Sequence, residues 1–116
     1  MDTFNLLMAV LSIALGAIGW LAPRYTMGAI DTQTIDESTM GLSEVRAASG
    51  ALFVGLGVGA LFLGTPAAFA MVGFAWGGAA IGRLTSIILD GAQPTKKLVF
   101  FLIEAAVAIP LIVINT

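Results

Sequence analysis

The chain has 116 residues, of which 10% are charged and 59% hydrophobic, whereas a soluble domain has about 25% charged residues. This composition excludes an ordinary soluble domain, and a net charge of −2 without a basic cluster excludes nucleic acid as a partner. The chain has no cysteine and no histidine, so it lacks thiolate and imidazole ligands, and we expect no metal site and no cofactor. The remaining class is a small polytopic membrane protein.

Four stretches are long and apolar enough to cross a bilayer, whose hydrocarbon core needs about 20 helical residues. The uncharged stretch between Arg46 and Arg83 is too long for one crossing. The tripeptide Gly64-Thr65-Pro66 divides it, because glycine favours the position after a helix, threonine the N-cap and proline the first helical position. The predicted spans are therefore about 3–22, 43–63, 66–89 and 96–114.

These spans predict an all-α polytopic membrane protein, a four-transmembrane-helix bundle that forms a single membrane domain over residues 1–116. The only long polar connection is the loop 23–42, which contains Asp31, Asp36 and Glu37. It is either a solvated connector or a docking surface, since long loops often carry function.

The basic residues Arg24, Lys96 and Lys97 all lie on the side of the two longer loops. Cytoplasmic loops carry an excess of lysine and arginine. We therefore expect a multi-pass protein of the bacterial inner (cytoplasmic) membrane with loops 23–42 and 90–95 in the cytoplasm and both termini in the periplasm.

Small residues form stripes at helical spacing, which let neighbouring helix backbones approach closely. The span 43–63 carries a ridge with one small residue every four positions, and opposite it lie Gly50 and Gly57. The predicted helix-packing residues are Ala47, Ala51, Gly55 and Gly59 in this ridge, and Gly73 with Gly77 and Gly78 with Gly82 in the span 66–89. These ridges either pack within the bundle or face a partner subunit.

Four ionisable residues fall inside or at the ends of the spans: Glu44, Arg46, Arg83 and Glu104. Each would cost about 2.5–3.5 kcal/mol at the centre of a membrane helix. Their distances from the loops place them in one layer, and Arg83 and Glu104 are the expected partners across the last two spans. Such a pair either fixes the register of the bundle or serves a function.

Two motifs resemble signatures of a family. These are Ser43-Glu44-Val45-Arg46-Ala47 followed by Ser49-Gly50, and Gly82-Arg83-Leu84 followed by Ser86, Asp90-Gly91 and Pro94. They resemble a bacterial family of uncharacterised four-helix integral membrane proteins, a domain of unknown function, and Glu104 matches its acidic residue in the fourth helix. The first motif departs mildly, with Gly50-Ala51 in place of Gly-Gly. The resemblance covers nearly the whole chain and implies the fold and the charged layer, but no activity. A looser likeness to DoxX-like membrane proteins rests on the number of spans.

Three functions are compatible with these features. The first is a non-catalytic accessory or assembly subunit, whose partners are the lipid bilayer and either other membrane protein subunits, as in a respiratory or photosynthetic complex, or further copies of itself. The second is a small transporter or channel that uses Glu104 and Arg83. The third is a membrane-embedded enzyme for a lipophilic substrate, for which only Glu44 and Glu104 are available as acid or base. The paired charges and small-residue ridges favour the first.

Overall fold

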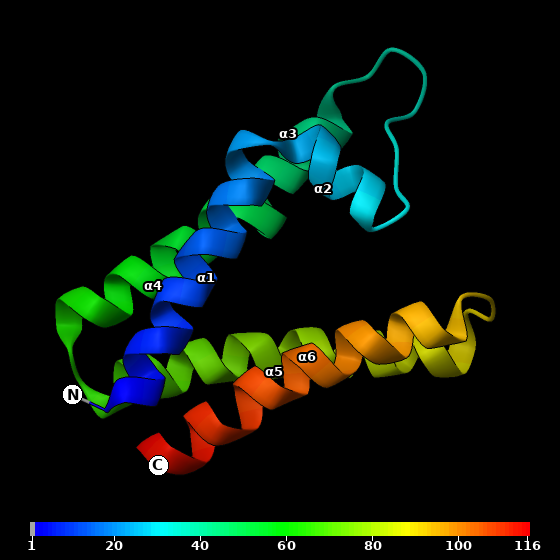
Figure 1. Cartoon of the computed structure of the whole chain (residues 1–116). Coiled ribbons are helices and arrows are strands. Elements are labelled where there is room, and N and C mark those ends of the chain that lie inside the picture. The colour runs from blue at the N-terminus through cyan, green and yellow to red at the C-terminus, as the bar shows by residue number, and fades with distance from the viewer. Residues whose placement is uncertain (1) are drawn as a thin grey trace. The chain divides into compact units, whose positions relative to one another are not determined.

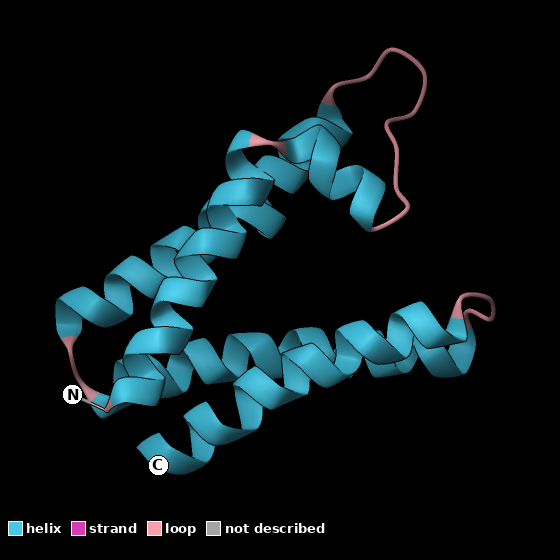
Figure 2. Cartoon of the chain, viewed as in Figure 1, coloured by secondary structure: helices cyan, strands magenta, loops and turns pink. Residues whose placement is uncertain are grey.

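The computed structural model describes residues 2–116, and all regular structure in this range is helical (Figures 1 and 2). The elements in chain order are α1 (Thr3–Leu21), α2 (Pro23–Ala29), α3 (Met40–Arg46), the π-helical turn η1 (Ala47–Ala51), α4 (Leu52–Leu63), α5 (Pro66–Leu89) and α6 (Pro94–Asn115). The all-α fold class predicted from the sequence is confirmed.

Four helices are long and apolar enough to cross a membrane: Thr3–Leu21, Met40–Leu63, Pro66–Leu89 and Pro94–Asn115. The second of these is the continuous run of α3, η1 and α4. The predicted turn between the second and third spans is present: Gly64 adopts a φ of 66°, and the Thr65 hydroxyl accepts a hydrogen bond from the Ala68 N–H at 3.3 Å. Pro66 then starts α5, where a missing N–H costs nothing.

The predicted loop 23–42 is shorter than expected, because Pro23 does not end the helical structure but begins α2 (Pro23–Ala29). Proline suits the first position of a helix since its φ is already helical and its N–H is not needed there. At the other end, α3 begins at Met40, whose N–H donates to the Ser38 hydroxyl at 3.1 Å. The non-helical connection is therefore residues 30–39.

The chain divides into two compact units. The first consists of the N-terminal residues up to Asn5 and of residues 63–116. In it α5 and α6 run side by side (Figure 1), and their short connection contains Gly91 and Gln93 with φ of 47° and 44°. Phe69 and Val72 of α5 and Leu111 of α6 are fully buried. This unit therefore has a core of interlocking side chains.

The second unit consists of residues 6–62. Here α1 packs antiparallel to the run of α3, η1 and α4, because Gly19 contacts Ser49 while Gly57 contacts Ala9. A Cβ added at Gly16 would lie 2.6 Å from the Gly50 carbonyl oxygen and 2.7 Å from the Val54 nitrogen. Glycine is required at such positions because the two backbones touch directly.

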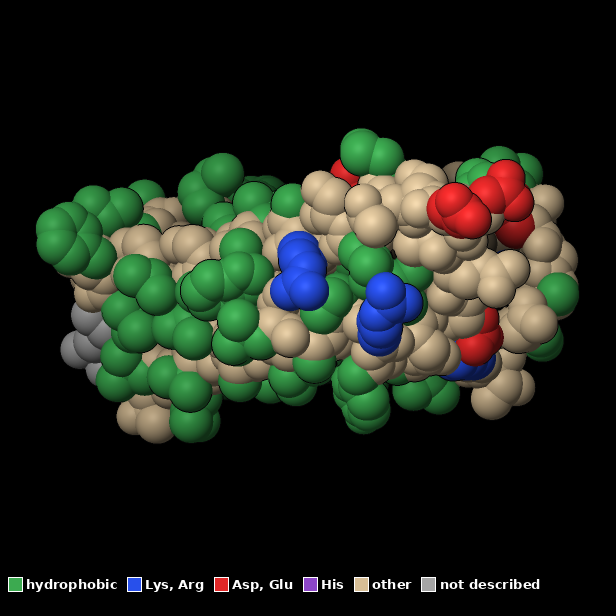
Figure 3. All heavy atoms as spheres, turned by 90° about the horizontal axis from the view of Figure 1, so that it is seen from above, with side chains coloured by type: hydrophobic (Ala, Val, Ile, Leu, Met, Phe, Trp, Pro, Cys, Tyr) green, Lys and Arg blue, Asp and Glu red, His purple; other side chains and the backbone are tan. Residues whose placement is uncertain are grey.

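Most of the surface of these helices is apolar and exposed. Between 22% and 28% of the residues in each candidate span are buried, so large hydrophobic side chains such as Phe62, Ile81 and Val113 lie on the surface. Hydrophobic side chains are spread along the face shown in Figure 3, where charged side chains are fewer. Exposed apolar surface of this extent is typical of a protein covered by lipid.

Candidate functional site

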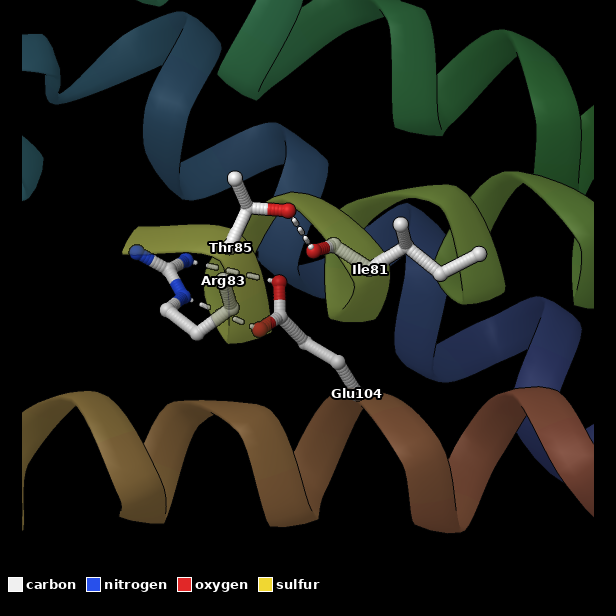
Figure 4. Close-up of polar contacts among 4 residues, drawn as sticks. All are labelled: Ile81, Arg83, Thr85 and Glu104. Atoms are coloured by element: carbon white, nitrogen blue, oxygen red, sulfur yellow. Dashed lines mark hydrogen bonds and ion pairs between the residues drawn. The ribbon is translucent and has the colours of Figure 1, made fainter. Parts of the chain in front are cut away.

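Arg83 of α5 and Glu104 of α6 point toward one another and are joined by two hydrogen bonds (Figure 4). Arg83 Nε donates to Glu104 Oε1 at 3.0 Å, and Arg83 Nη2 donates to Oε2 at 3.4 Å. The Glu104 side chain is 10% exposed and that of Arg83 35%. The planar guanidinium matches the carboxylate, so both carboxylate oxygens are satisfied by one partner.

The aromatic ring of Phe100, one turn before Glu104 on α6, completes this site. The guanidinium carbon of Arg83 lies 5.1 Å from the centre of the ring, a distance at which a cation is attracted to an aromatic face. The nearby Thr85 hydroxyl donates to the Ile81 carbonyl of its own helix at 2.8 Å (Figure 4). The cluster joins α5 to α6 through two hydrogen bonds and one cation–aromatic contact.

The other two charged residues predicted for the same layer do not pair with each other. Arg46 Nη1 donates to the main-chain carbonyl of Trp20 at 2.7 Å, while Glu44 is exposed and forms no ion pair within residues 6–62. Residues two apart on a helix project to opposite sides. Arg46 instead satisfies a carbonyl at the C-terminal end of α1, where the helix dipole is negative.

The sequence analysis did not predict the π-helical turn η1 (Ala47–Ala51), which directly follows Arg46. In this turn the Leu52 N–H reaches back five residues to the Ala47 carbonyl. Such turns are rare in proteins, and those that occur are frequently found at functional sites. The one signal in the sequence is the run of small residues from 47 to 51, which also fits an ordinary helix.

Beside this turn the second unit has an open hollow of about 490 Å³. Its lining includes Trp20 from α1, Ser43 and Arg46 from α3, and Ala47 and Ala51 from η1. The hollow thus combines a cation and a hydroxyl with apolar walls. Across residues 2–116, no group of three or more aspartates and glutamates is placed to hold a metal ion.

The glycine face that packs in the second unit differs from the predicted ridge. A Cβ added at Gly55 or Gly59 would meet no heavy atom within 4 Å in the described chain, whereas Gly50 and Gly57 contact α1. Gly55 and Gly59 of the predicted ridge therefore do not pack against α1, and the ridge stays a prediction for a neighbour outside the second unit. The physical reason is that α1 presents its own glycines at this contact, and glycine against glycine allows a closer approach than a ridge that carries two alanines.

In the first unit one of the two predicted glycine pairs packs against α6. A Cβ at Gly73 would lie 2.9 Å from Leu111 Cβ, and one at Gly77 would lie 3.6 Å from Ala108 Cβ. Gly78 and Gly82 have no neighbour within 4 Å in the described chain, so that they do not serve as packing residues between α5 and α6.

A second polar contact was not predicted from the sequence. Asn5 Nδ2 donates to Asn115 Oδ1 at 2.8 Å, and Asn115 Nδ2 donates to Asn5 Oδ1 at 2.7 Å. Asn5 is 4% exposed. Two asparagines at the ends of apolar segments were the available signal, since a buried amide needs a partner.

Comparison with known proteins adds a family but no activity. No curated protein and no solved structure matches the chain. The family model of a domain of unknown function, DUF4345, matches residues 2–115. Since this match covers nearly the whole chain, including every residue of the sites described above, the protein belongs to the DUF4345 family.

Proposed function

We propose that this protein is a non-catalytic membrane subunit that assembles through its helices with another membrane protein or with a second copy of itself. The observation that carries the proposal is the small-residue face of α4 that the second unit leaves open: a Cβ added at Gly55 or Gly59 would meet no atom of residues 6–62 within 4 Å outside the helix's own backbone. The exposed side chains of Leu52, Val58 and Phe62 flank this face.

Energetics support an interface at this face. Glycine in the middle of a helix costs about 1 kcal/mol relative to alanine, and in membrane helices close backbone packing recovers that cost. Gly16, Gly50 and Gly57 recover it by contacts within the second unit. Gly55 and Gly59 recover it only when another chain segment covers them.

The polar groups also favour a subunit over a transporter or an enzyme. Both carboxylate oxygens of Glu104 accept hydrogen bonds from Arg83, so this acidic side chain is engaged in a contact between α5 and α6. Arg46 is engaged with a backbone carbonyl. These contacts stabilise the helix pairs and leave few groups for chemistry.

The test is Gly55→Leu, with Ala14→Leu on the exposed face of α1 as the matched control. Tagged variants are purified in mild detergent from native membranes, and co-purifying proteins and oligomeric mass are measured. We expect Gly55→Leu to remain folded and lose the partner or second copy, while Ala14→Leu keeps it. If wild-type protein is monomeric without partners, or if Gly55→Leu assembles normally, the proposal fails.

We further propose that the protein lies in the bacterial inner membrane with residues 30–39 and 90–95 in the cytoplasm and the termini in the periplasm. Arg24, Lys96 and Lys97 near these connections support this orientation. Since the chain has no native cysteine, a single cysteine at Gln33 should resist a membrane-impermeant thiol reagent on intact cells, whereas Thr116→Cys should react. The opposite labelling pattern would show that the protein has the reverse orientation in the membrane.

A further inference from the structure

We propose that the hollow beside η1 binds the phosphate of an anionic phospholipid headgroup, with Arg46 as the residue that binds it. The hollow has a volume of about 490 Å³ and lies entirely within the second unit, residues 6–62. The proposed ligand is a lipid, and it is independent of any protein partner on the face of Gly55 and Gly59.

Arg46 is a fixed cation with spare hydrogen-bond donors. One guanidinium nitrogen donates to the Trp20 carbonyl at 2.7 Å, which holds the side chain at the rim of the hollow. A guanidinium has five N–H donors, so most remain for a phosphate, whose oxygens it binds well. Arg46 forms no ion pair with a carboxylate of residues 6–62, and none of the residues that line the hollow is acidic.

The position of the hollow along the helix matches the headgroup layer. The span Met40–Leu63 has 24 residues, about 36 Å of helix at 1.5 Å per residue, which exceeds the hydrocarbon thickness of about 30 Å. Its first residues therefore lie among the headgroups, and the long side chain of Arg46 reaches that level. Trp20, in the last turn of α1, is typical of the same interface.

The shape of the site favours a lipid over a soluble phosphate. Leu42, Ala47 and Ala51 give the hollow an apolar lining beside Arg46. An acyl chain attached to a phosphate at Arg46 can follow this apolar surface into the hydrocarbon. A free phosphate would gain nothing from it.

The test uses the fluorescence of Trp20. The variant Trp76→Phe leaves Trp20 as the only tryptophan, and the full chain is reconstituted in mixed vesicles of phosphatidylglycerol and phosphatidylcholine in which one or the other lipid carries brominated acyl chains that quench tryptophan. We expect brominated phosphatidylglycerol to occupy the site about fivefold more than phosphatidylcholine at equal mole fraction, since one basic residue near the surface contributes about that preference. Equal quenching by the two lipids would overturn the proposal.

Two variants in this background identify the residue. Arg46→Gln should abolish the preference, whereas the control Arg24→Gln, which does not line the hollow, should retain it. If Arg46→Gln does not fold, Ala47→Phe, at an exposed position, fills the hollow and should reduce the preference without changing charge. A preference that persists in the folded Arg46→Gln variant or in Ala47→Phe contradicts the assignment. Relief of quenching by soluble glycerol phosphate would show that the site binds a free phosphate. This result would contradict the assignment of the ligand as a lipid.

Discussion

The two helix pairs of this protein are held together by different kinds of contact. In the unit of residues 63–116, α5 and α6 join through side chains: a core around Leu111 and the Arg83–Glu104 ion pair. In the unit of residues 6–62, the helices join through backbone, with glycines in direct contact and Arg46 bound to a main-chain carbonyl. The comparison shows that membrane helices of similar length and hydropathy pack by two routes, which respond to different substitutions.

The largest effect is expected where backbones touch. Gly50→Leu places a side chain against the backbone of Gly19 and Trp20, where nothing flexible gives way. We expect the free energy of unfolding to fall by more than about 3 kcal/mol, the upper end of the usual range for overpacking. Unfolding in sodium dodecyl sulfate measures the loss, with Gly55→Leu as the control because its added Cβ meets no neighbour in the described chain. Equal stability of the two variants would contradict a backbone-packed unit.

A smaller but still large effect is expected at the ion pair. Arg83→Leu and Glu104→Leu each leave one charge without its partner, which costs roughly 3–5 kcal/mol for a buried pair. We expect about 3 kcal/mol, the lower end of that range, since the Arg83 side chain is 35% exposed and partly screened.

The double variant sharpens the interpretation of this pair. Arg83→Leu with Glu104→Leu should recover much of the lost stability, because two leucines are compatible with an apolar interface. A double-mutant cycle on the unfolding free energy gives the coupling energy. Simple additivity of the single losses would show that the two side chains stabilise the protein independently of their contact.

The smallest effect is expected at the reciprocal amide contact. Asn5→Leu removes two side-chain hydrogen bonds to Asn115, and interhelical hydrogen bonds in membrane proteins are worth about 1 kcal/mol. Asn115 also donates to the Leu111 carbonyl at 2.7 Å, so it is not left wholly unpaired. The same unfolding assay should show a loss of about 1 kcal/mol, and a loss as large as that of Arg83→Leu would reverse our ranking.

Sequence reasoning succeeded where a feature depends on local rules. The turn at Gly64-Thr65-Pro66 follows from the preferences of three adjacent residues, and the four spans follow from hydropathy and length. The choice of Arg83 and Glu104 as partners depended on their similar depth from one connection, and the structure brings these two side chains together.

The features that were missed depend on which element lies opposite. Both faces of the span 43–63 carry small residues, and only the position of Gly16 and Gly19 on α1 decides which one packs. Arg46 contacts the backbone carbonyl of Trp20. Every residue has this group, so the residue type at position 20 could not predict the contact. The turn η1 likewise has a composition that fits an ordinary helix.

The nature of the atom that each arginine contacts has a consequence for how the family can vary in sequence. Arg83 binds a side chain, so its replacement in another member should be accompanied by a change at the position of Glu104. Arg46 binds a carbonyl that every amino acid possesses. We therefore expect the positions of Arg83 and Glu104 to covary across the family, and the positions of Arg46 and Trp20 to change independently of each other.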